Sequence, residues 1–223
     1  MARRAPSATR TRRGSAPAVR AAWSATYERQ HYANLPWFDP DPSSQVRDSV
    51  ANGFWPPGSP LLDIGCGAGS NVLFLARAGF AAHGIDLSPG AVRAARERAA
   101  ASHLSIDVRE GDALALPFPA RRFAGATDNG CFHTIPFGRR NDYAREVHRV
   151  VRPGGGFVLA WAAREYTGER GPPHRPSLDE VARALESRFQ FVRTVFRPSS
   201  EAGGLAAYIA WMIRRDRPQP PRR

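Results

Sequence analysis

The chain has 223 residues, of which 42% are hydrophobic, and this length and composition are typical of one α/β domain with a sizeable core. No apolar run approaches 18 residues, so we predict no membrane-spanning helix. A formal charge of +12 would favour a nucleic-acid partner if it were spread over the chain, but it is concentrated at the two ends.

Residues 1–20 carry six arginines and no acid, and residues 214–223 carry five arginines and one aspartate. The segment between them holds 21 arginines and 19 acidic residues, a net charge of only +2. We therefore expect residues 1–20 and 217–223 to be disordered tails and nucleic acid to be an unlikely partner. A tail that binds nucleic acid or a membrane remains the alternative.

The two cysteines, Cys66 and Cys131, form neither a disulfide framework nor the spacing of zinc ligands. An organellar transit peptide shares the composition of residues 1–20, but Pro6 and Pro17 interrupt a continuous amphipathic helix. No apolar core of a secretory signal follows the arginines. We expect a cytoplasmic protein without a metal.

Strands and helices alternate along the rest of the chain. Strands are predicted at 61–65, 81–87, 105–112, 123–130, 156–162, 189–197 and 205–215. Helices are predicted at 70–78, from Pro89 to about 101, at about 140–151, and after a capping box at Ser177–Glu180. These repeats predict a doubly wound α/β sheet with right-handed crossovers. A short link joins the last two strands, so they form a hairpin and one of them runs antiparallel.

Three glycines follow the first strand at alternate positions, Gly65, Gly67 and Gly69, with Asp63 just before them. A tight turn and the close approach of a ligand to the backbone both require glycine here. A dinucleotide site would have Gly or Ala where this chain has Ser70, and Asp63 would repel a pyrophosphate. S-adenosylmethionine has an ammonium, a sulfonium and no phosphate, so it tolerates an acid at this position.

Two further acids end the next two strands. Asp86, 21 residues after Gly65, is placed to accept both hydroxyls of a ribose, which fits either cofactor. Asp112 could accept from an adenine amino group with Ala113 beside the ring, although a turn residue is the alternative for Asp112 alone.

Four ordered motifs, LLDIGCGAGSN, HGIDLSPGAV, EGDALALPF and VVRPGGGFVLAW, resemble the class I S-adenosylmethionine-dependent methyltransferases over about residues 35–215. The resemblance implies a Rossmann-like sheet of seven strands with the last antiparallel, a helical cap over 21–55 and a methyltransferase domain over 56–216. It implies that S-adenosylmethionine is bound by Trp37, Asp63, Gly65, Cys66, Gly67, Gly69, Asp86, Leu87, Asp112, Ala113 and Asp128.

Two more stretches, ANLPWFDPDPSS and DNGCFHTIP, are similar to the small-molecule branch that includes thiopurine, thiol, halide and tellurite methyltransferases. In that branch Trp37 would cover the cofactor, and Asp128 and His133 would line the transfer pocket as catalytic residues. Residues 38–40 are Phe-Asp-Pro, whereas the branch commonly has Asp-x-Gly after the tryptophan. The Asn/Asp-Pro-Pro-Tyr motif of amino-methylating nucleic-acid enzymes is absent after the fourth strand.

The acceptor is predicted to be a small molecule, such as a thiol or another soft nucleophile, with His133 as a candidate base and a packing histidine as its alternative. Tyr166, Arg170 and His174 are candidate substrate contacts in a loop after the fifth strand. Alternative functions are O- or N-methylation of a natural product, cofactor binding without transfer, and an NAD(P)-dependent oxidoreductase.

Overall fold

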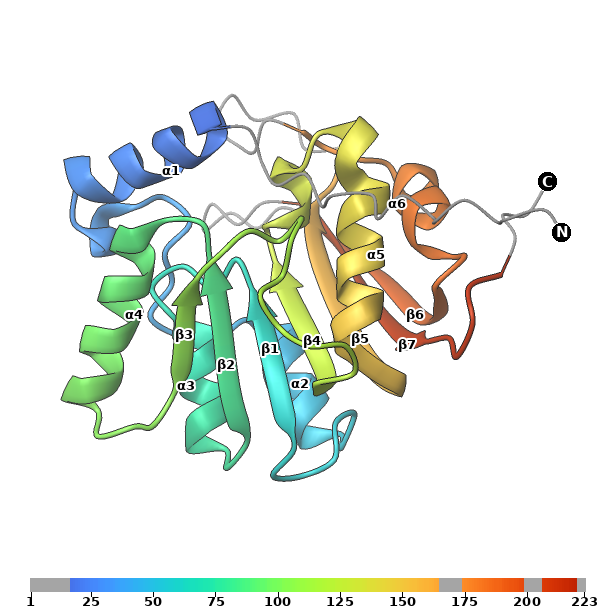
Figure 1. The fold of residues 1–223 in the computed structure, drawn as a ribbon, viewed down its shortest axis with the longest axis horizontal. Helices are drawn as coiled ribbons and strands as arrows, with labels where there is room; N and C mark the ends of the chain where they lie inside the picture. Colours follow the sequence, from blue (N-terminus) through green and yellow to red (C-terminus); the bar gives the residue numbers. More distant parts are fainter. Residues whose placement is uncertain (1–16, 165–173, 199–205, 220–223) are drawn as a thin grey trace, which may run out of the picture.

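The computed structural model describes residues 17–164, 174–198 and 206–219. Within them, seven strands form one sheet in the order β3-β2-β1-β4-β5-β7-β6 (Figure 1). The strands are β1 (Pro60–Ile64), β2 (Ala81–Asp86), β3 (Asp107–Glu110), β4 (Phe123–Asn129), β5 (Val151–Ala162), β6 (Phe189–Arg197) and β7 (Ala207–Arg214). β1 to β5 pair in parallel, and β7 runs antiparallel to both of its neighbours, which confirms the predicted seven-stranded α/β fold.

The helices lie on both faces of this sheet (Figure 1). They are α1 (Pro17–Arg29), α2 (Ser44–Ala51), α3 (Ser70–Arg77), α4 (Pro89–Ala101), α5 (Arg140–Val150) and α6 (Leu178–Leu185), with 3-10 turns η1 (Tyr32–Asn34), η2 (Phe132–Thr134) and η3 (Phe137–Arg139). The predicted caps form: Ser88 accepts the N–H of Ala91 at the start of α4, and Ser177 and Glu180 make a capping box on α6.

Alternation along the strands divides the core into two layers. Leu61 and Leu62 are neighbours in β1 and are both buried, but they belong to opposite clusters. One cluster unites the sheet with α5 and α6, and the other unites it with α2, α3 and α4. Because both faces are covered, consecutive side chains of the central strands β1 and β4 are buried.

Two strands differ in length from their predictions. β3 covers four residues instead of eight, and the turn in which Oδ1 of Asp112 accepts the N–H of Leu114 follows it. β5 begins at Val151 instead of residue 156, since Val151 pairs with Phe123 before a register shift. Gly154 has a φ of 73° and lies inside β5. It therefore marks an irregularity within this strand and does not belong to a loop that precedes the strand.

The N-terminal segment is partly built into the domain core. Val46 of α2 is fully buried, and Trp55 is only 1% exposed. The indole N–H of Trp55 donates to the carbonyl oxygen of Gly156 (3.1 Å), and a Cβ on Gly125 would lie 2.2 Å from that nitrogen. The expected cap over 21–55 therefore includes residues that the sheet needs for its packing.

The expected tails lie mostly outside the described residues, as does the 199–205 link of the hairpin. α1 begins at Pro17, three residues before the expected end of the first tail. At the other end, the N–H of Gln219 donates to the carbonyl oxygen of Ser187 (2.6 Å). Ordered contacts therefore extend into both segments that were expected to be tails.

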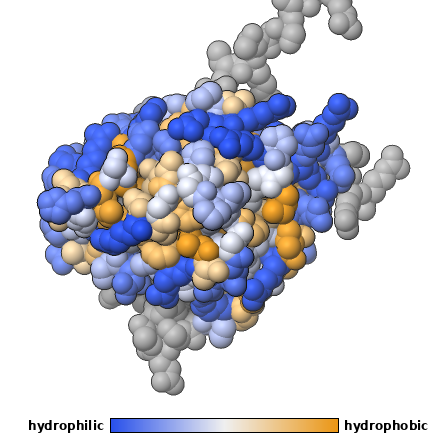
Figure 2. Space-filling model, turned by 90° about the horizontal axis from the view of Figure 1, so that it is seen from below, coloured by the Kyte–Doolittle hydropathy of each residue, from blue (hydrophilic) through white to orange (hydrophobic). Residues whose placement is uncertain are grey.

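The glycine loop lies at the carboxyl end of the sheet, where α1 crosses above the strands (Figure 1). Seen from below, at the end of the molecule opposite this loop, the surface has a hydrophilic rim and small separate hydrophobic groups (Figure 2). No helix among the described residues has the length and apolarity needed to cross a bilayer. Within the same residues, no three His, Cys, Asp or Glu side chains are grouped to hold a metal ion.

Candidate active site

The loop from Gly65 to Gly69 connects β1 to α3 and needs glycine for two reasons. Gly65, Gly67 and Gly69 have φ values of 69°, 54° and 85°, a region that other residues rarely adopt. Two of them also pack too closely for a side chain: a Cβ on Gly65 would lie 2.5 Å from Cβ of Cys131, and one on Gly69 would lie 2.9 Å from Cβ of Ala95. The loop is thus held tightly against the neighbouring elements.

Asp86 holds this loop from the end of β2. Its Oδ2 accepts the N–H of Gly67 (2.9 Å), and its Oδ1 accepts the N–H of Ser88 (2.9 Å). Burial raises the pKa of Asp86, and these N–H donors oppose that rise. A carboxylate oxygen accepts more than one hydrogen bond, so the side chain retains capacity for the hydroxyls of a ribose. Asp86 therefore fits the predicted diol ligand.

Asp63 lies beneath the loop rather than in it. It is only 2% exposed and is hydrogen-bonded to the side chain of Asn71. Burial, followed by the nearby negative charge of Asp128, raises the pKa of Asp63 well above its usual range. The Oδ1 of Asn71 in turn accepts the N–H and the hydroxyl of Ser43, both at 2.9 Å. Asp63 thus links the loop to the segment that precedes α2.

Asp112 and Ala113 follow β3 and are both 9% exposed. The Oδ1 of Asp112 accepts the N–H of Leu114 (2.8 Å), so this carboxylate supports a local turn. The N–H of Gly111 donates to the backbone carbonyl of Asp86, which brings the ends of β2 and β3 together. Asp86 and Asp112, the predicted ribose and adenine contacts, therefore lie at the ends of adjacent strands.

Helix α1 covers the glycine loop with aromatic side chains. A Cβ on Gly67 would lie 3.1 Å from the hydroxyl oxygen of Tyr27, so this phenol stands directly on the loop. Burial, followed by the negative charge of Asp86, raises the pKa of Tyr27 above its usual value, and a hydrogen bond from Trp37 opposes that rise. Trp37 is 53% exposed and meets Trp23 edge-on, with ring centroids 5.7 Å apart. The predicted covering residue Trp37 is thus joined by Tyr27.

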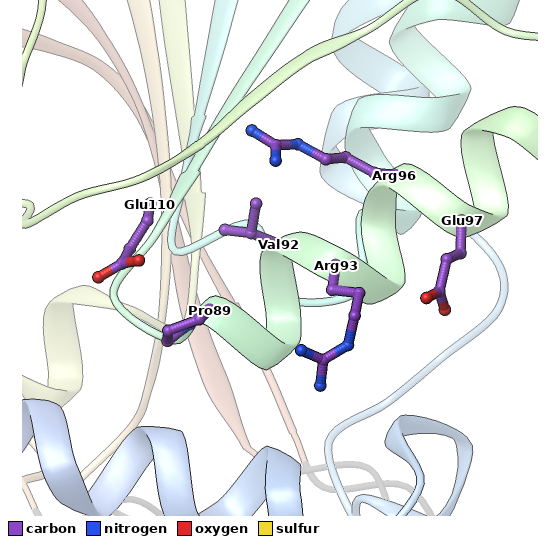
Figure 3. Close-up of a pocket in the computed structure, with 6 residues that line it drawn as sticks. All are labelled: Pro89, Val92, Arg93, Arg96, Glu97 and Glu110. Atoms are coloured by element: carbon purple, nitrogen blue, oxygen red, sulfur yellow. The ribbon is translucent and has the colours of Figure 1, made fainter.

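Arg20 of α1 crosses the ends of β2 and β3. Its NH1 donates to the carbonyl oxygen of Leu87 (3.5 Å) and forms an ion pair with Glu110. A hollow of about 380 Å³ lies beside this ion pair, between α4 and the end of β3 (Figure 3). Its lining residues are Pro89, Val92, Arg93, Arg96, Glu97 and Glu110. The predicted contact Leu87 is therefore half-buried under α1, and the hollow lies outside the glycine loop.

Arg98 of α4 holds the segment around Trp37 in place, and no sequence motif indicates it. Its NH1 donates to the carbonyl oxygen of Ala68 (2.6 Å), and its NH2 donates to that of Pro40 (3.4 Å). The guanidinium also lies over the rings of Tyr32 and Phe38, at 5.7 and 5.1 Å from their centroids. One arginine therefore connects the glycine loop to the cover.

Asp128 is fully buried at the end of β4 and has several protein partners. Its Oδ1 accepts the N–H groups of Cys131 (2.8 Å) and Phe132 (3.3 Å), and its Oδ2 accepts the hydroxyl of Tyr143 (2.5 Å). Burial raises the pKa of Asp128 to about 7, although these donors oppose the rise. These contacts fix η2 against the end of β4 and engage both carboxylate oxygens of Asp128.

His133 is half-buried on η2 and accepts a backbone hydrogen bond. The N–H of Ala162 donates to its Nδ1 (3.0 Å). Burial, followed by the charge of the nearby His174, lowers the pKa of His133 to about 4. The ring is therefore neutral near pH 7, and because Nδ1 is an acceptor, its proton is on Nε2. The nitrogen that remains for a substrate is a donor, so His133 does not offer a free lone pair to a proton.

The two thiols are not activated. Cys66 is 8% exposed, and its N–H donates to the carbonyl oxygen of Ile85 (3.0 Å). Burial raises the pKa of both Cys66 and Cys131 well above the usual range. Of the candidate substrate contacts after β5, Tyr166 and Arg170 lie outside the described residues, and His174 lines a hollow near His133.

Comparisons with known proteins agree with this geometry. Residues 61–155 match the family model described as a methyltransferase domain. The chain is 33% identical over 127 residues to a demethylmenaquinone methyltransferase of Symbiobacterium thermophilum, covering 54% of this chain and 49% of that protein. It is 28% identical over 156 residues to a 2-heptyl-1-hydroxyquinolin-4(1H)-one methyltransferase of Mycobacteroides abscessus, with 67% of each chain covered. The chain thus spans about half of the first relative and two thirds of the second.

Solved structures share the fold across most of the chain. A structure reported for the conversion of a disulfide bond into a thioacetal group during echinomycin biosynthesis has a TM-score of 0.78 at 24% identity, covering 88% of this chain and 92% of that one. The cyclase SpnF has a TM-score of 0.70 at 21% identity, covering 91% and 96%. This protein has the fold of the class I S-adenosylmethionine-dependent methyltransferases.

Proposed function

We propose that this protein transfers a methyl group from S-adenosylmethionine to a small molecule. The observation that carries the proposal is the Gly67–Asp86 pair: a left-handed glycine donates its N–H to a carboxylate that ends β2 and keeps capacity for a ribose. Asp112 adds a second acid at the neighbouring strand end, an environment that disfavours the pyrophosphate of a nicotinamide cofactor.

Each group would contact a different part of S-adenosylmethionine. Asp86 would accept from the ribose, Asp112 and Ala113 would bind the adenine, and the loop backbone with Asp63 beneath it would face the amino acid part. Tyr27 and Trp37 would exclude water above the sulfonium. When bound, the cofactor supplies a methyl group on a positively charged sulfur, which leaves as a neutral thioether. The protein supplies position and a dry site.

The acceptor is proposed to reach the site already nucleophilic. His133 has its Nδ1 lone pair engaged by Ala162, and Asp128 is enclosed by its own donors. A thiol or an acidic oxygen loses its proton to water without help, whereas an ammonium would need a base. The hydroxyquinolone methyltransferase described above is named for an oxygen-bearing acceptor, and so is a fatty-acid O-methyltransferase of Mycolicibacterium smegmatis that is 33% identical over 111 residues. These relatives support an ionised oxygen as an acceptor in addition to a thiol. Nε2–H of His133 would then orient the acceptor by donating to it.

Methyl-labelled S-adenosylmethionine incubated with thiols, phenols, carboxylic acids and amines tests this function. We expect label in a thiol, phenol or carboxylate product and none in an amine. Saturable cofactor binding without transfer to any acceptor would instead support a binding protein, or another activity on the same fold. Failure to bind the cofactor at all would refute the proposal.

A further inference from the structure

A second hollow lies on the acceptor side of the sheet, between η3, the start of α5, the residues that follow β5 and the start of α6. Its volume is about 280 Å³. The residues that line it include three arginines and one acid: Arg140, Arg164, Arg175 and Glu180, together with His174 and Phe137. This concentration of arginine contrasts with the nearly neutral centre of the chain.

The one carboxylate among these lining residues is already engaged. Oε2 of Glu180 accepts the N–H of Ser177 (2.8 Å) in the capping box and NH2 of Arg164 (2.7 Å). These contacts lower the pKa of Glu180, so it remains ionised. Arg164 and Glu180 are thus paired, and the formal charge of the described lining residues is positive.

Arg140 is the least exposed of the three arginines, at 4%. Its guanidinium lies over the rings of Phe132 and Phe137, at 5.4 and 5.7 Å from their centroids. Nε donates to the carbonyl oxygen of Ile135 (3.3 Å), and within the described residues no hydrogen bond from its two terminal nitrogens is found. Among the described residues, Thr127 has the one buried side-chain polar atom without a partner, so the terminal nitrogens of Arg140 reach the solvent of the hollow. Their N–H groups are therefore available there to an anion.

The hollow adjoins the place where methyl transfer is proposed. Arg140 lies on Phe132, whose N–H binds the carboxylate at the end of β4. His174, which lines the hollow, is close enough to His133 to lower the pKa of that ring. A molecule that extends from the hollow to η2 would thus pass the two histidines.

We propose that this hollow binds a carboxylate of the acceptor, so that the substrate is a small organic acid with its reacting atom elsewhere in the molecule. This inference rests on the proposed function. Arg binds planar carboxylates through paired N–H donors, and Phe137, 66% exposed, offers an apolar surface to the body of the molecule. The carboxylate is a recognition group rather than the nucleophile, because guanidinium groups occupy its lone pairs.

Calorimetric titrations of the full chain saturated with S-adenosylhomocysteine test the proposal, with benzoate, its neutral isostere benzamide, and phenyl phosphate as probes. We expect benzoate to bind at least 10-fold more tightly than benzamide and no weaker than phenyl phosphate. Arg140→Gln and Arg164→Gln should each weaken benzoate about 10-fold or more. Arg183→Gln removes the same charge from an exposed position on α6 outside the hollow, and it should leave benzoate binding unchanged.

The outcomes separate this inference from the proposed function. Equal binding of benzoate and benzamide by a protein that binds S-adenosylhomocysteine would overturn the carboxylate site and leave the methyltransferase proposal intact. If the protein binds benzoate but has no affinity for S-adenosylhomocysteine, the carboxylate site is supported and the methyltransferase proposal is overturned. Phenyl phosphate binding more than 10-fold tighter than benzoate would overturn the choice of carboxylate. If Arg140→Gln does not fold, Arg164→Gln decides the result, since that side chain is 60% exposed.

Discussion

Replacing His133 tests whether this ring donates a hydrogen bond or removes a proton. His133→Asn keeps an oxygen near the position of Nδ1 to accept the N–H of Ala162, whereas His133→Ala removes that acceptor. Ala162 is only 3% exposed, so its N–H would be left buried and unpaired in the alanine variant. We expect the alanine variant to lose about 1–3 kcal/mol of unfolding free energy and the asparagine variant clearly less.

The same variants give a prediction for turnover. A general base contributes about 10²–10⁴-fold when the proton leaves in the transition state. An orienting donor to an already ionised acceptor contributes much less, so His133→Asn should slow the best acceptor by about 10-fold or less, with the remaining loss recovered at higher pH. The assay is methyl transfer from labelled cofactor, followed from pH 6 to pH 9 for both proteins. A loss beyond about 10³-fold that persists at pH 9 would make His133 the base and refute the tautomer argument.

The pH dependence of stability supplies an independent check. A fall in the pKa of His133 from 6.5 to about 4 corresponds to about 3 kcal/mol, which is lost as the pH drops from 6.5 towards 4, because the unfolded chain then binds the extra proton. Asp128 changes the free energy of unfolding in the opposite direction. Its pKa is raised to about 7 in the folded state, so its contribution lowers the stability as the pH rises from about 4 to 7. The comparison must therefore be the wild type against His133→Asn, which leaves Asp128 in place. A difference in unfolding free energy that is independent of pH would contradict a buried neutral ring.

Three further predictions concern the cofactor side and η2. Asp86→Ala should weaken S-adenosylhomocysteine by about 1.5–3 kcal/mol in calorimetric titration, and unchanged affinity in a folded variant would remove Asp86 from the site. Asp128→Ala should lower the free energy of unfolding in urea by about 3 kcal/mol, because three donors lose their acceptor. Asp128→Asn should lower it by less than half of that. Equal losses for the two variants would show that these hydrogen bonds do not contribute. Deleting residues 1–16 should leave cofactor affinity and small-molecule turnover intact. Deletion through Arg29 also removes Tyr27 and should weaken cofactor binding. A loss of affinity or turnover in the shorter deletion would show that residues 1–16 contribute to the site.

Local chemistry in the sequence determined most of the fold. The left-handed glycines, the caps at Ser88 and Ser177 and the apolar alternation act over a few residues, so their patterns indicated the strands, the helices and the acids at the ends of β1, β2 and β3. The antiparallel last strand also followed, because a short link leaves a hairpin as the available connection. The bounds of β3 and β5 were not determined in this way, since a neighbouring strand supplies the pairing that starts or ends each of them.

Only the tertiary structure decided which side chains meet over the loop and at the acceptor side. Arg98 is one of several arginines on α4, and nothing in its neighbours along the chain separates it from them, yet it alone of the described arginines there contacts Ala68 and Pro40. The protonation of His133 depends on an N–H at the end of β5, 29 residues away. The positive hollow depends on residues brought together from η3, α5, α6 and the segments between β5 and α6. A sequence records which groups are present, but hydrogen-bond partners, which fix the position of a proton, and the charges that line a hollow are set when distant segments pack together.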